Sequence, residues 1–205
     1  MDKTIDTRFG SLHAHVQGQG PAVLLIHGYH PDNDWQVWEN NVGALAGAGF
    51  CVYALDMLGY GRSEGPRLDH VQQAQALLDV MAEAGIESAT VGGVSWGGLI
   101  ALELALSAPE KVERLILVDS AGAGQVSEEQ LETIDCPTLV VWGEDDSVLP
   151  LANAAWFGAA IPQARVETIP EVTAREGVPE WGGHHPMRFK PEAFNRILLD
   201  FLTSA

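Results

Sequence analysis

One serine lies between glycines at a point where the chain changes from one kind of structure to another. Residues 93–97, GVSWG, have the form G-x-S-x-G, with a strand-like apolar run before them and a helical pattern after them. Small residues allow a turn tight enough to hold a serine hydroxyl outside the end of a sheet. Backbone N–H groups at the start of the next helix favour negative charge developing there. The pattern predicts a nucleophile at Ser95; a serine in a tight packing turn is the alternative.

A serine hydroxyl is a weak nucleophile at neutral pH. It needs a base within hydrogen-bond reach and a further group that orients the base. The C-terminal part of the chain offers three neighbouring carboxylates and two neighbouring histidines: Glu144, Asp145, Asp146, His184 and His185. The residue types alone leave the choice among them open.

Length and composition limit the architecture and the partners. The chain has 205 residues, of which 46% are hydrophobic, and this size predicts a single domain over residues 1–205. The net charge of −17 argues against nucleic acid and anionic membranes as partners. The first residues, MDKTIDTRFG, hold no apolar leader and no apolar run is long enough to span a bilayer, so we expect a cytoplasmic protein. Cys51 and Cys136 adjoin strand-like runs and are expected to be free thiols.

Apolar runs alternate with helical patterns along the chain, as is typical of parallel strands joined by crossover helices. The predicted strands cover 12–16, 21–28, 50–56, 89–94, 114–119, 138–143 and 165–169. The predicted helices cover 38–48, 68–85 and 96–108, a short helix opened by a capping box from Ser127 to Gln130, a helix near 150–160, and a last helix after Pro191. The helix at 68–85 is expected to bury one face made of Val71, Ala74, Leu77, Leu78 and Met81, and to end at Gly85.

The serine motif resembles that of the α/β-hydrolase superfamily, and the resemblance extends over nearly the whole chain. Four more segments resemble motifs of that family, in the family's order: LLIHGY at 24–29, DMLGYGRS at 56–63, WGEDDSVLP at 142–150 and GHHPMRFKPEAFNRILLDFL at 183–202. The resemblance implies the α/β-hydrolase fold, an α/β architecture in which a mostly parallel twisted sheet has helices on both faces.

The resemblance also implies which residues complete a catalytic triad with the serine. In this fold the acid and then the histidine follow the nucleophile along the chain. The family pattern G-H-x-P, matched at 183–186, places the base at His184 and leaves His185 at the variable position. The pattern G-x-x-D-x-x-x-P, matched at 143–150, selects Asp146 as the acid. His185 and the two acidic neighbours of Asp146 stay as alternatives.

Two backbone N–H groups are expected to form an oxyanion hole, again from the resemblance. They belong to Tyr29 and Trp96, and removing one such donor costs about 3 to 4 kcal/mol of transition-state stabilisation. The side chains of both residues serve equally well as packing or as pocket walls. His27 is expected to brace the oxyanion loop, and Asp56 to brace a turn, rather than to take part in the chemistry.

The chain departs from the family pattern in two places. Many relatives insert a helical lid between the strands predicted at 114–119 and 138–143, but here the connection is short and the lid is expected to be absent or minimal. An insertion at 170–182 precedes the predicted base, and its Trp181 either walls the substrate pocket or belongs to a mobile surface loop.

The predicted function is hydrolysis of a small-molecule carboxylic ester through an acyl-enzyme, with no cofactor. The pairs His13 with His15 and His27 with His30 lack a matching third ligand, so no metal is expected. Asp32 and Asp34, close after the oxyanion loop, make highly anionic substrates such as coenzyme A thioesters less favourable. Two alternatives stay open: a non-catalytic binding module of the same fold, and a lyase, perhydrolase or acyl-transfer enzyme that uses the same site. The sequence does not predict the oligomeric state.

Overall fold

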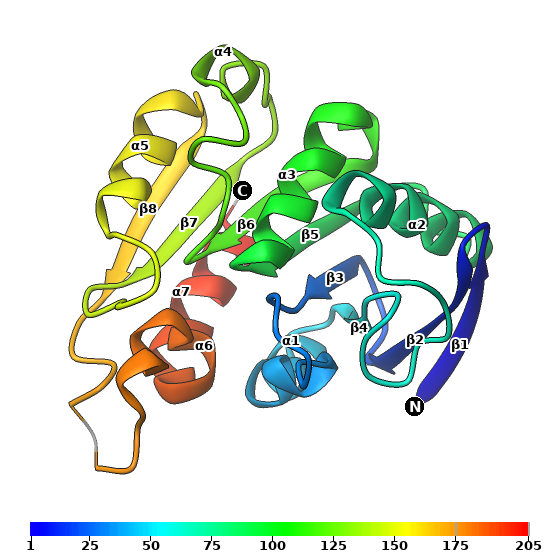
Figure 1. The fold of residues 1–205 in the computed structure, drawn as a ribbon, viewed down its shortest axis with the longest axis horizontal. Coiled ribbons are helices and arrows are strands. Elements are labelled where there is room, and N and C mark those ends of the chain that lie inside the picture. The colour runs from blue at the N-terminus through cyan, green and yellow to red at the C-terminus, as the bar shows by residue number, and fades with distance from the viewer. Residues whose placement is uncertain (175, 205) are drawn as a thin grey trace.

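Eight strands form one sheet in the computed structural model, which describes residues 1–174 and 176–204 (Figure 1). The strands are β1 (Asp2–Thr7), β2 (Gly10–Gln17), β3 (Ala22–Ile26), β4 (Cys51–Asp56), β5 (Ala89–Val94), β6 (Val112–Val118), β7 (Thr138–Gly143) and β8 (Ala164–Ile169). Their order in the sheet is β1-β2-β4-β3-β5-β6-β7-β8. Strand β2 pairs antiparallel with both β1 and β4, and every pair from β4 to β8 is parallel. The mostly parallel sheet that we predicted is confirmed.

The first strand was missed by the sequence analysis. Five of the six residues of β1 are outside the core and only Ile5 is buried, so no apolar run marks it. It forms because its backbone pairs with β2 from Asp2 opposite His15 to Thr7 opposite Gly10. An edge strand needs only one apolar face and one partner, and local sequence shows neither clearly.

Helices cover both faces of the sheet (Figure 1). The helices are α1 (Glu39–Gly47), α2 (His70–Glu83), α3 (Trp96–Ser107), α4 (Glu128–Leu131), α5 (Ala152–Ala160), α6 (Pro186–Phe189) and α7 (Pro191–Thr203), with 3-10 helices η1 (Trp35–Trp38), η2 (Pro109–Lys111) and η3 (Glu180–His184). One buried cluster joins the sheet to α2, α3, α4 and α5, and a second joins it to α1, α6 and α7.

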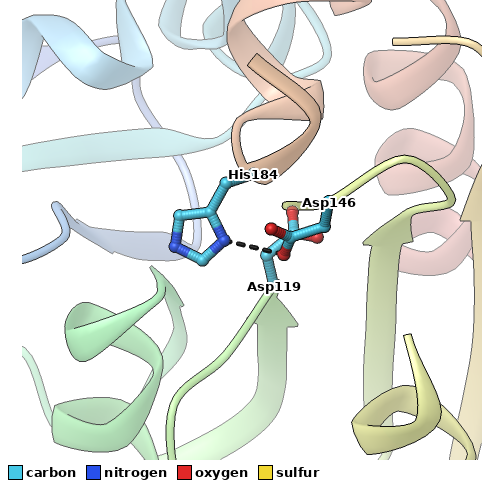
Figure 2. Close-up of side chains that lie close together, drawn as sticks. All are labelled: Asp119, Asp146 and His184. Atoms are coloured by element: carbon cyan, nitrogen blue, oxygen red, sulfur yellow. Dashed lines mark hydrogen bonds and ion pairs between the residues drawn. The ribbon is translucent and has the colours of Figure 1, made fainter. Parts of the chain in front are cut away.

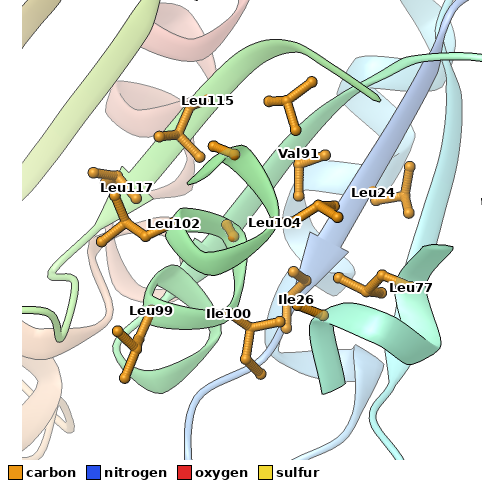
Figure 3. Packing of buried hydrophobic residues seen from close by; sticks show 14 of the residues in the cluster. Leu24, Ile26, Leu77, Val91, Leu99, Ile100, Leu102, Leu104, Leu115 and Leu117 are labelled. Atoms are coloured by element: carbon orange, nitrogen blue, oxygen red, sulfur yellow. The ribbon is translucent and has the colours of Figure 1, made fainter. Parts of the chain in front are cut away.

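Strand β3 shows how one apolar run serves both clusters. Leu24 and Ile26 belong to the first cluster, while Val23 and Leu25 belong to the second. Successive side chains of a strand point to opposite faces, so a central parallel strand is apolar throughout. Figure 3 shows Leu24 and Ile26 among the side chains of α2 and α3. This double burial fixes β3 and β5 at the centre of the sheet.

The buried face predicted for helix α2 is confirmed for most of its residues and wrong for one. Ala74 and Leu77 are buried and Gly85 follows the helix with a φ of 68°, as its role as a stop requires. Val71, the second residue of α2, is 38% exposed, contrary to the prediction, and Leu78 is only partly buried. Gln73 is buried instead, and its amide exchanges hydrogen bonds with the backbone of Leu58.

The connection from β6 to β7 carries no helical lid. Residues 119–137 are all described, and their only helix is the four-residue α4. The capping box predicted at its start is present, since Ser127 and Gln130 exchange side-chain and backbone hydrogen bonds. Within the described part of the chain, no helix combines the length and the apolar character needed to cross a membrane.

Candidate active site

Ser95 occupies a strained turn between β5 and α3. Its φ of 55° and ψ of −120° lie outside the regions that L-residues ordinarily adopt. Hydrogen bonds hold the turn: Ser95 N donates to Val118 O at 3.0 Å, and Ser95 O accepts from Gly98 N at 3.0 Å and Ala121 N at 2.9 Å. The strain is therefore maintained by the neighbouring strand β6 and the start of α3.

The glycines around the serine are required by close backbone approach. A Cβ at Gly93 would overlap the carbonyl carbon of Gly97, and a Cβ at Gly97 would overlap the carbonyl oxygen of Ile26. A Cβ at Gly98 would collide with the side chain of Ser120. Helix α3 can thus start directly against the ends of β3 and β5 only because these positions lack side chains.

His184 and Asp146 are brought together at the carboxyl end of the sheet (Figure 2). His184 Nδ1 lies 2.8 Å from Asp146 Oδ2, and both side chains are almost fully buried. Asp146 Oδ1 accepts from Val148 N at 2.7 Å and Leu149 N at 3.1 Å. Burial opposes the charged carboxylate, but these hydrogen bonds outweigh it and hold the pKa of Asp146 below its ordinary value. A carboxylate accepts only, so Nδ1 carries the proton and Nε2 keeps its lone pair.

Two more glycines allow this meeting. A Cβ at Gly143, the last residue of β7, would overlap the carbonyl oxygen of Gly183, and a Cβ at Gly183 would overlap the carbonyl oxygen of Asp145. The 3-10 helix η3, which ends at His184, therefore lies directly on the loop that follows β7.

His185, the alternative base, has a different environment. Its ring packs edge to face on Trp181 with centroids 5.4 Å apart, and its buried Nδ1 has no hydrogen-bond partner among the described residues. Burial, together with the charges of His184 and Arg188, lowers the pKa of His185 to about 3. The ring is held neutral with no carboxylate to orient it.

The alternative acids face away from the histidines. Asp145 accepts from Val172 N at 3.1 Å and Thr173 N at 2.7 Å, so it anchors the start of the 170–182 insertion. Glu144 accepts from the hydroxyl of Thr168 at 2.7 Å. Of the three neighbouring carboxylates, the structure places Asp146 against His184 and uses the other two to hold loops.

A cavity of about 690 Å³ lies over these groups. Ser95 and His184 both line it, together with His185 and Trp181. Trp181 therefore forms part of the pocket wall, one of the two roles considered for it. Residue 175 of the same insertion lies outside the described residues. The rim is open, since Tyr29 is 63% exposed and Trp181 is 45% exposed.

The loop after β3 presents a fixed peptide beside the serine. Gly28 O accepts from His27 Nδ1 and from Asn33 Nδ2, each at 2.9 Å. A peptide unit is planar, so holding this carbonyl also fixes the Tyr29 N–H, which points the opposite way. A Cβ at Gly28 would lie 3.3 Å from Ser95 Cβ, which places the loop next to the turn. Among the described residues, none accepts a hydrogen bond from the backbone N–H of Tyr29 or of Trp96.

His27 links this loop to the next strand. It is fully buried, and its Nε2 accepts from Met57 N at 3.1 Å while Nδ1 contacts Gly28 O. Burial lowers the pKa of His27, which keeps the ring neutral in this position. This is the bracing role expected for it. Asn33 was not anticipated, because a single asparagine in the run HPDND is ordinary loop composition.

Asp56 also braces a turn, as expected. Its carboxylate accepts from Trp35 N at 2.7 Å and Arg62 N at 2.8 Å. His13 Nδ1 lies 2.8 Å from Asp56 Oδ2, without the geometry of a hydrogen bond. Neither His13 nor Asp56 lines the cavity that contains Ser95.

Asp119 is a buried acid that the sequence analysis did not single out. It follows β6 directly and lies beside the histidine and acid described above (Figure 2). Among the described residues, Asp119, Asp146 and His184 form the one group whose ligand atoms, all within 4.8 Å of one another, could hold a metal ion. His184 Nδ1 already faces Asp146 at 2.8 Å, so a hydrogen bond accounts for two of the three residues.

Comparison with known proteins identifies related sequences. A sequence model of the family described as "alpha/beta hydrolase fold" matches residues 21–135. An uncharacterized protein of Mycobacterium tuberculosis is 40% identical over 109 residues, which cover 52% of this chain and 31% of the relative. The matched region thus spans about a third of that relative's length. A 2-hydroxy-6-oxo-6-phenylhexa-2,4-dienoate hydrolase of Burkholderia cepacia is 25% identical over 271 residues, covering 94% of this chain and 91% of the relative. That alignment is longer than this chain because the relative carries insertions.

Solved structures share the same fold. A protein of Thermoplasma acidophilum described as a "predicted CIB-like hydrolase" superposes with a TM-score of 0.86 at 25% identity, over 98% of this chain and 97% of that one. A carboxylesterase from Bacillus subtilis gives a TM-score of 0.86 at 20% identity, over 100% of this chain and 92% of that one. At this identity the second likeness supports the fold alone.

Proposed function

Because the chain belongs to the alpha/beta hydrolase fold family, we propose that it is a serine hydrolase that cleaves carboxylic esters. The observation that carries the proposal is the position of Ser95, strained at a φ of 55°, in one cavity with His184, whose Nδ1 lies 2.8 Å from Asp146. A strained backbone maintained by the surrounding structure is typical of a functional site.

Acylation begins with the serine hydroxyl. Ser95 Oγ attacks the ester carbonyl carbon while His184 Nε2 removes its proton. Asp146 orients the ring and stabilises the imidazolium that forms. The carbonyl π electrons move to its oxygen, and the backbone N–H groups of Tyr29 and Trp96 donate to this oxyanion. The carbonyl then re-forms, the ester C–O bond breaks, and His184 gives its proton to the leaving alcohol.

Deacylation repeats these steps with water. His184 removes a proton from a water molecule, whose oxygen attacks the acyl carbon, and the bond to Ser95 Oγ breaks as Oγ regains a proton from His184. The products are a carboxylic acid and the free enzyme. An open cavity without a lid suits this reaction, because water is the second substrate.

The shape and charge of the cavity guide the choice of substrate. The exposed rings of Tyr29 and Trp181 offer apolar contact at the rim, while Asp32 and Arg188 provide charges of opposite sign in the lining. We propose a small neutral ester as substrate, with no metal or cofactor in the reaction. The cytoplasmic location expected from the sequence stays a prediction.

The proposal is tested with a fluorophosphonate probe and short-chain nitrophenyl esters. Wild-type protein should be labelled at Ser95 and should hydrolyse the esters, and Ser95→Ala should lose both properties while its thermal unfolding stays similar. A broader panel of lactones, thioesters and dienoates would define the acyl group. No labelling of folded wild-type protein would contradict the proposal and favour the non-catalytic binding module. If Ser95 is labelled but the protein turns over only substrates other than esters, a different reaction at the same site would be favoured.

A further inference from the structure

Asp119 has one carboxylate oxygen that nothing in the described chain satisfies. The side chain is fully buried at the carboxyl end of β6, with a backbone φ of 41°. Asp119 Oδ1 accepts from Gly143 N at 2.9 Å. Asp119 Oδ2 is buried without a hydrogen-bond donor among the described residues. A buried ionised oxygen without a donor is costly, so its state requires an explanation.

The groups that face Asp119 are mostly acidic. Asp146 and His184 each place a polar atom within 4.8 Å of one of its oxygens, and Figure 2 shows the two carboxyl groups side by side. Asp145, from the same loop as Asp146, adds a further negative charge nearby. Two adjacent buried carboxylates cannot both ionise without a large electrostatic cost, and they usually share one proton.

The hydrogen bonds decide which carboxyl group holds that proton. Asp146 receives three N–H donors, from His184, Val148 and Leu149, whereas Asp119 receives one, from Gly143. Donors stabilise the ionised form, so Asp146 stays charged and Asp119 takes the proton. The pKa of Asp119 is raised well above its ordinary value, first by burial, in agreement with this assignment.

We propose that Asp119 is protonated at neutral pH and donates a hydrogen bond from Oδ2 to the Asp146 carboxylate, which makes it a positioning residue for the pair His184 and Asp146. The bond fixes the rotation of the Asp146 side chain and satisfies the orphaned oxygen. With Asp119 neutral, the carboxylate that faces the imidazolium during turnover is that of Asp146. The consequence for turnover rests on the proposed function, whereas the protonation of Asp119 is independent of it.

Two variants test whether the Asp119 carboxyl group acts in its protonated or its ionised form: Asp119→Asn and Asp119→Ala. Asparagine keeps an oxygen for Gly143 N and supplies an N–H for Asp146, and it tolerates a positive φ. We expect Asp119→Asn to keep kcat and the pH profile of kcat/KM close to wild type. Asp119→Ala should lower kcat about tenfold, leave KM unchanged and move the acidic limb of the profile to higher pH. An equal loss in both variants, with both folded, would overturn the proposal.

Infrared spectroscopy tests the proton without any turnover. Wild-type protein at pH 7 should show the carbonyl stretch of a protonated carboxyl group, and Asp119→Asn should lack it. Asp56→Asn, which changes another buried aspartate, is the matched control and should keep the band. Absence of the band in wild-type protein would overturn the proposal even if the protein is an esterase. Its presence in a protein without hydrolase activity would support the shared proton and refute the proposed function separately.

Discussion

Two buried histidine–aspartate pairs in the described part of the chain look alike locally. His13 Nδ1 lies 2.8 Å from Asp56 Oδ2, and His184 Nδ1 lies 2.8 Å from Asp146 Oδ2. In each pair the histidine is almost fully buried and the aspartate side chain is completely buried. Each aspartate also accepts two backbone N–H groups. Distance and burial therefore do not distinguish a candidate catalytic pair from a structural one.

The pairs differ in what the second imidazole nitrogen faces. His13 Nε2 lies 3.5 Å from Arg62 Nη1 and 3.8 Å from an oxygen of Asp2, in a cluster of surface charges. His184 lines the cavity that also contains Ser95. A base acts only on a proton within its reach, so the location of the pair relative to a nucleophile determines its chemistry.

The largest expected effect separates the two histidines. His184→Ala should lower kcat for nitrophenyl acetate by about 10⁵- to 10⁶-fold, since loss of the base removes proton transfer. His13→Ala should leave kcat within a few-fold of wild type and lower the midpoint of thermal unfolding. His185→Ala is the matched control beside the site and should retain most of the turnover. The reverse result for the two neighbouring histidines would show that His185 is the base.

Replacing the two aspartates should change kcat by factors that differ less than those for the two histidines. Asp146→Asn should lower kcat by about 10⁴-fold, because the amide no longer holds His184 in the correct tautomer. Asp56→Asn should lower the free energy of unfolding, since it weakens the hydrogen bonds that the Asp56 carboxylate accepts from Trp35 N and Arg62 N. Steady-state kinetics and urea unfolding of both variants check this. Comparable kcat losses would mean that the second pair also serves turnover.

A smaller effect is expected from Asn33, which supports the site from the oxyanion side. Asn33→Ala removes one of the two bonds that hold Gly28 O and so loosens the peptide that carries the Tyr29 N–H. We expect kcat to fall about tenfold with little change in KM, less than the loss of a whole oxyanion donor. Asn40→Ala, an exposed asparagine outside this loop, is the control. A change confined to KM would assign Asn33 to substrate binding.

The smallest effect concerns His185, which has no carboxylate partner among the described residues. Its pKa of about 3 in the fold lies below the value of about 6.5 for an unfolded chain. The unfolded state therefore binds more protons between these values, and the free energy of unfolding falls with falling pH, by at most about 1.4 kcal/mol per unit. His185→Phe should flatten the dependence measured by urea unfolding from pH 6.5 to 4.5. Asp146, with a lowered pKa, loses its contribution only at more acidic pH. If His185→Phe leaves the pH dependence of the free energy of unfolding unchanged, the lowered pKa of His185 is contradicted.

The sequence predicted the central architecture because those signals are local. The strand β3 is a continuous apolar run, Gly85 ends α2, and the capping box opens α4, and each depends on neighbouring residues. The edge strand β1 and the exposure of Val71 depend on partners elsewhere in the chain, so composition alone did not reveal them.

The sequence by itself determined that a serine would be held in a tight glycine turn, because the motif is contiguous and steric demands act over a few residues. The family resemblance had selected His184 and Asp146, but only the tertiary structure brings the two into contact and places Asn33 and Asp119 beside the site. Those contacts join residues far apart along the chain. Their geometry depends on the order of the strands and on glycines that let backbones approach, which no local pattern specifies.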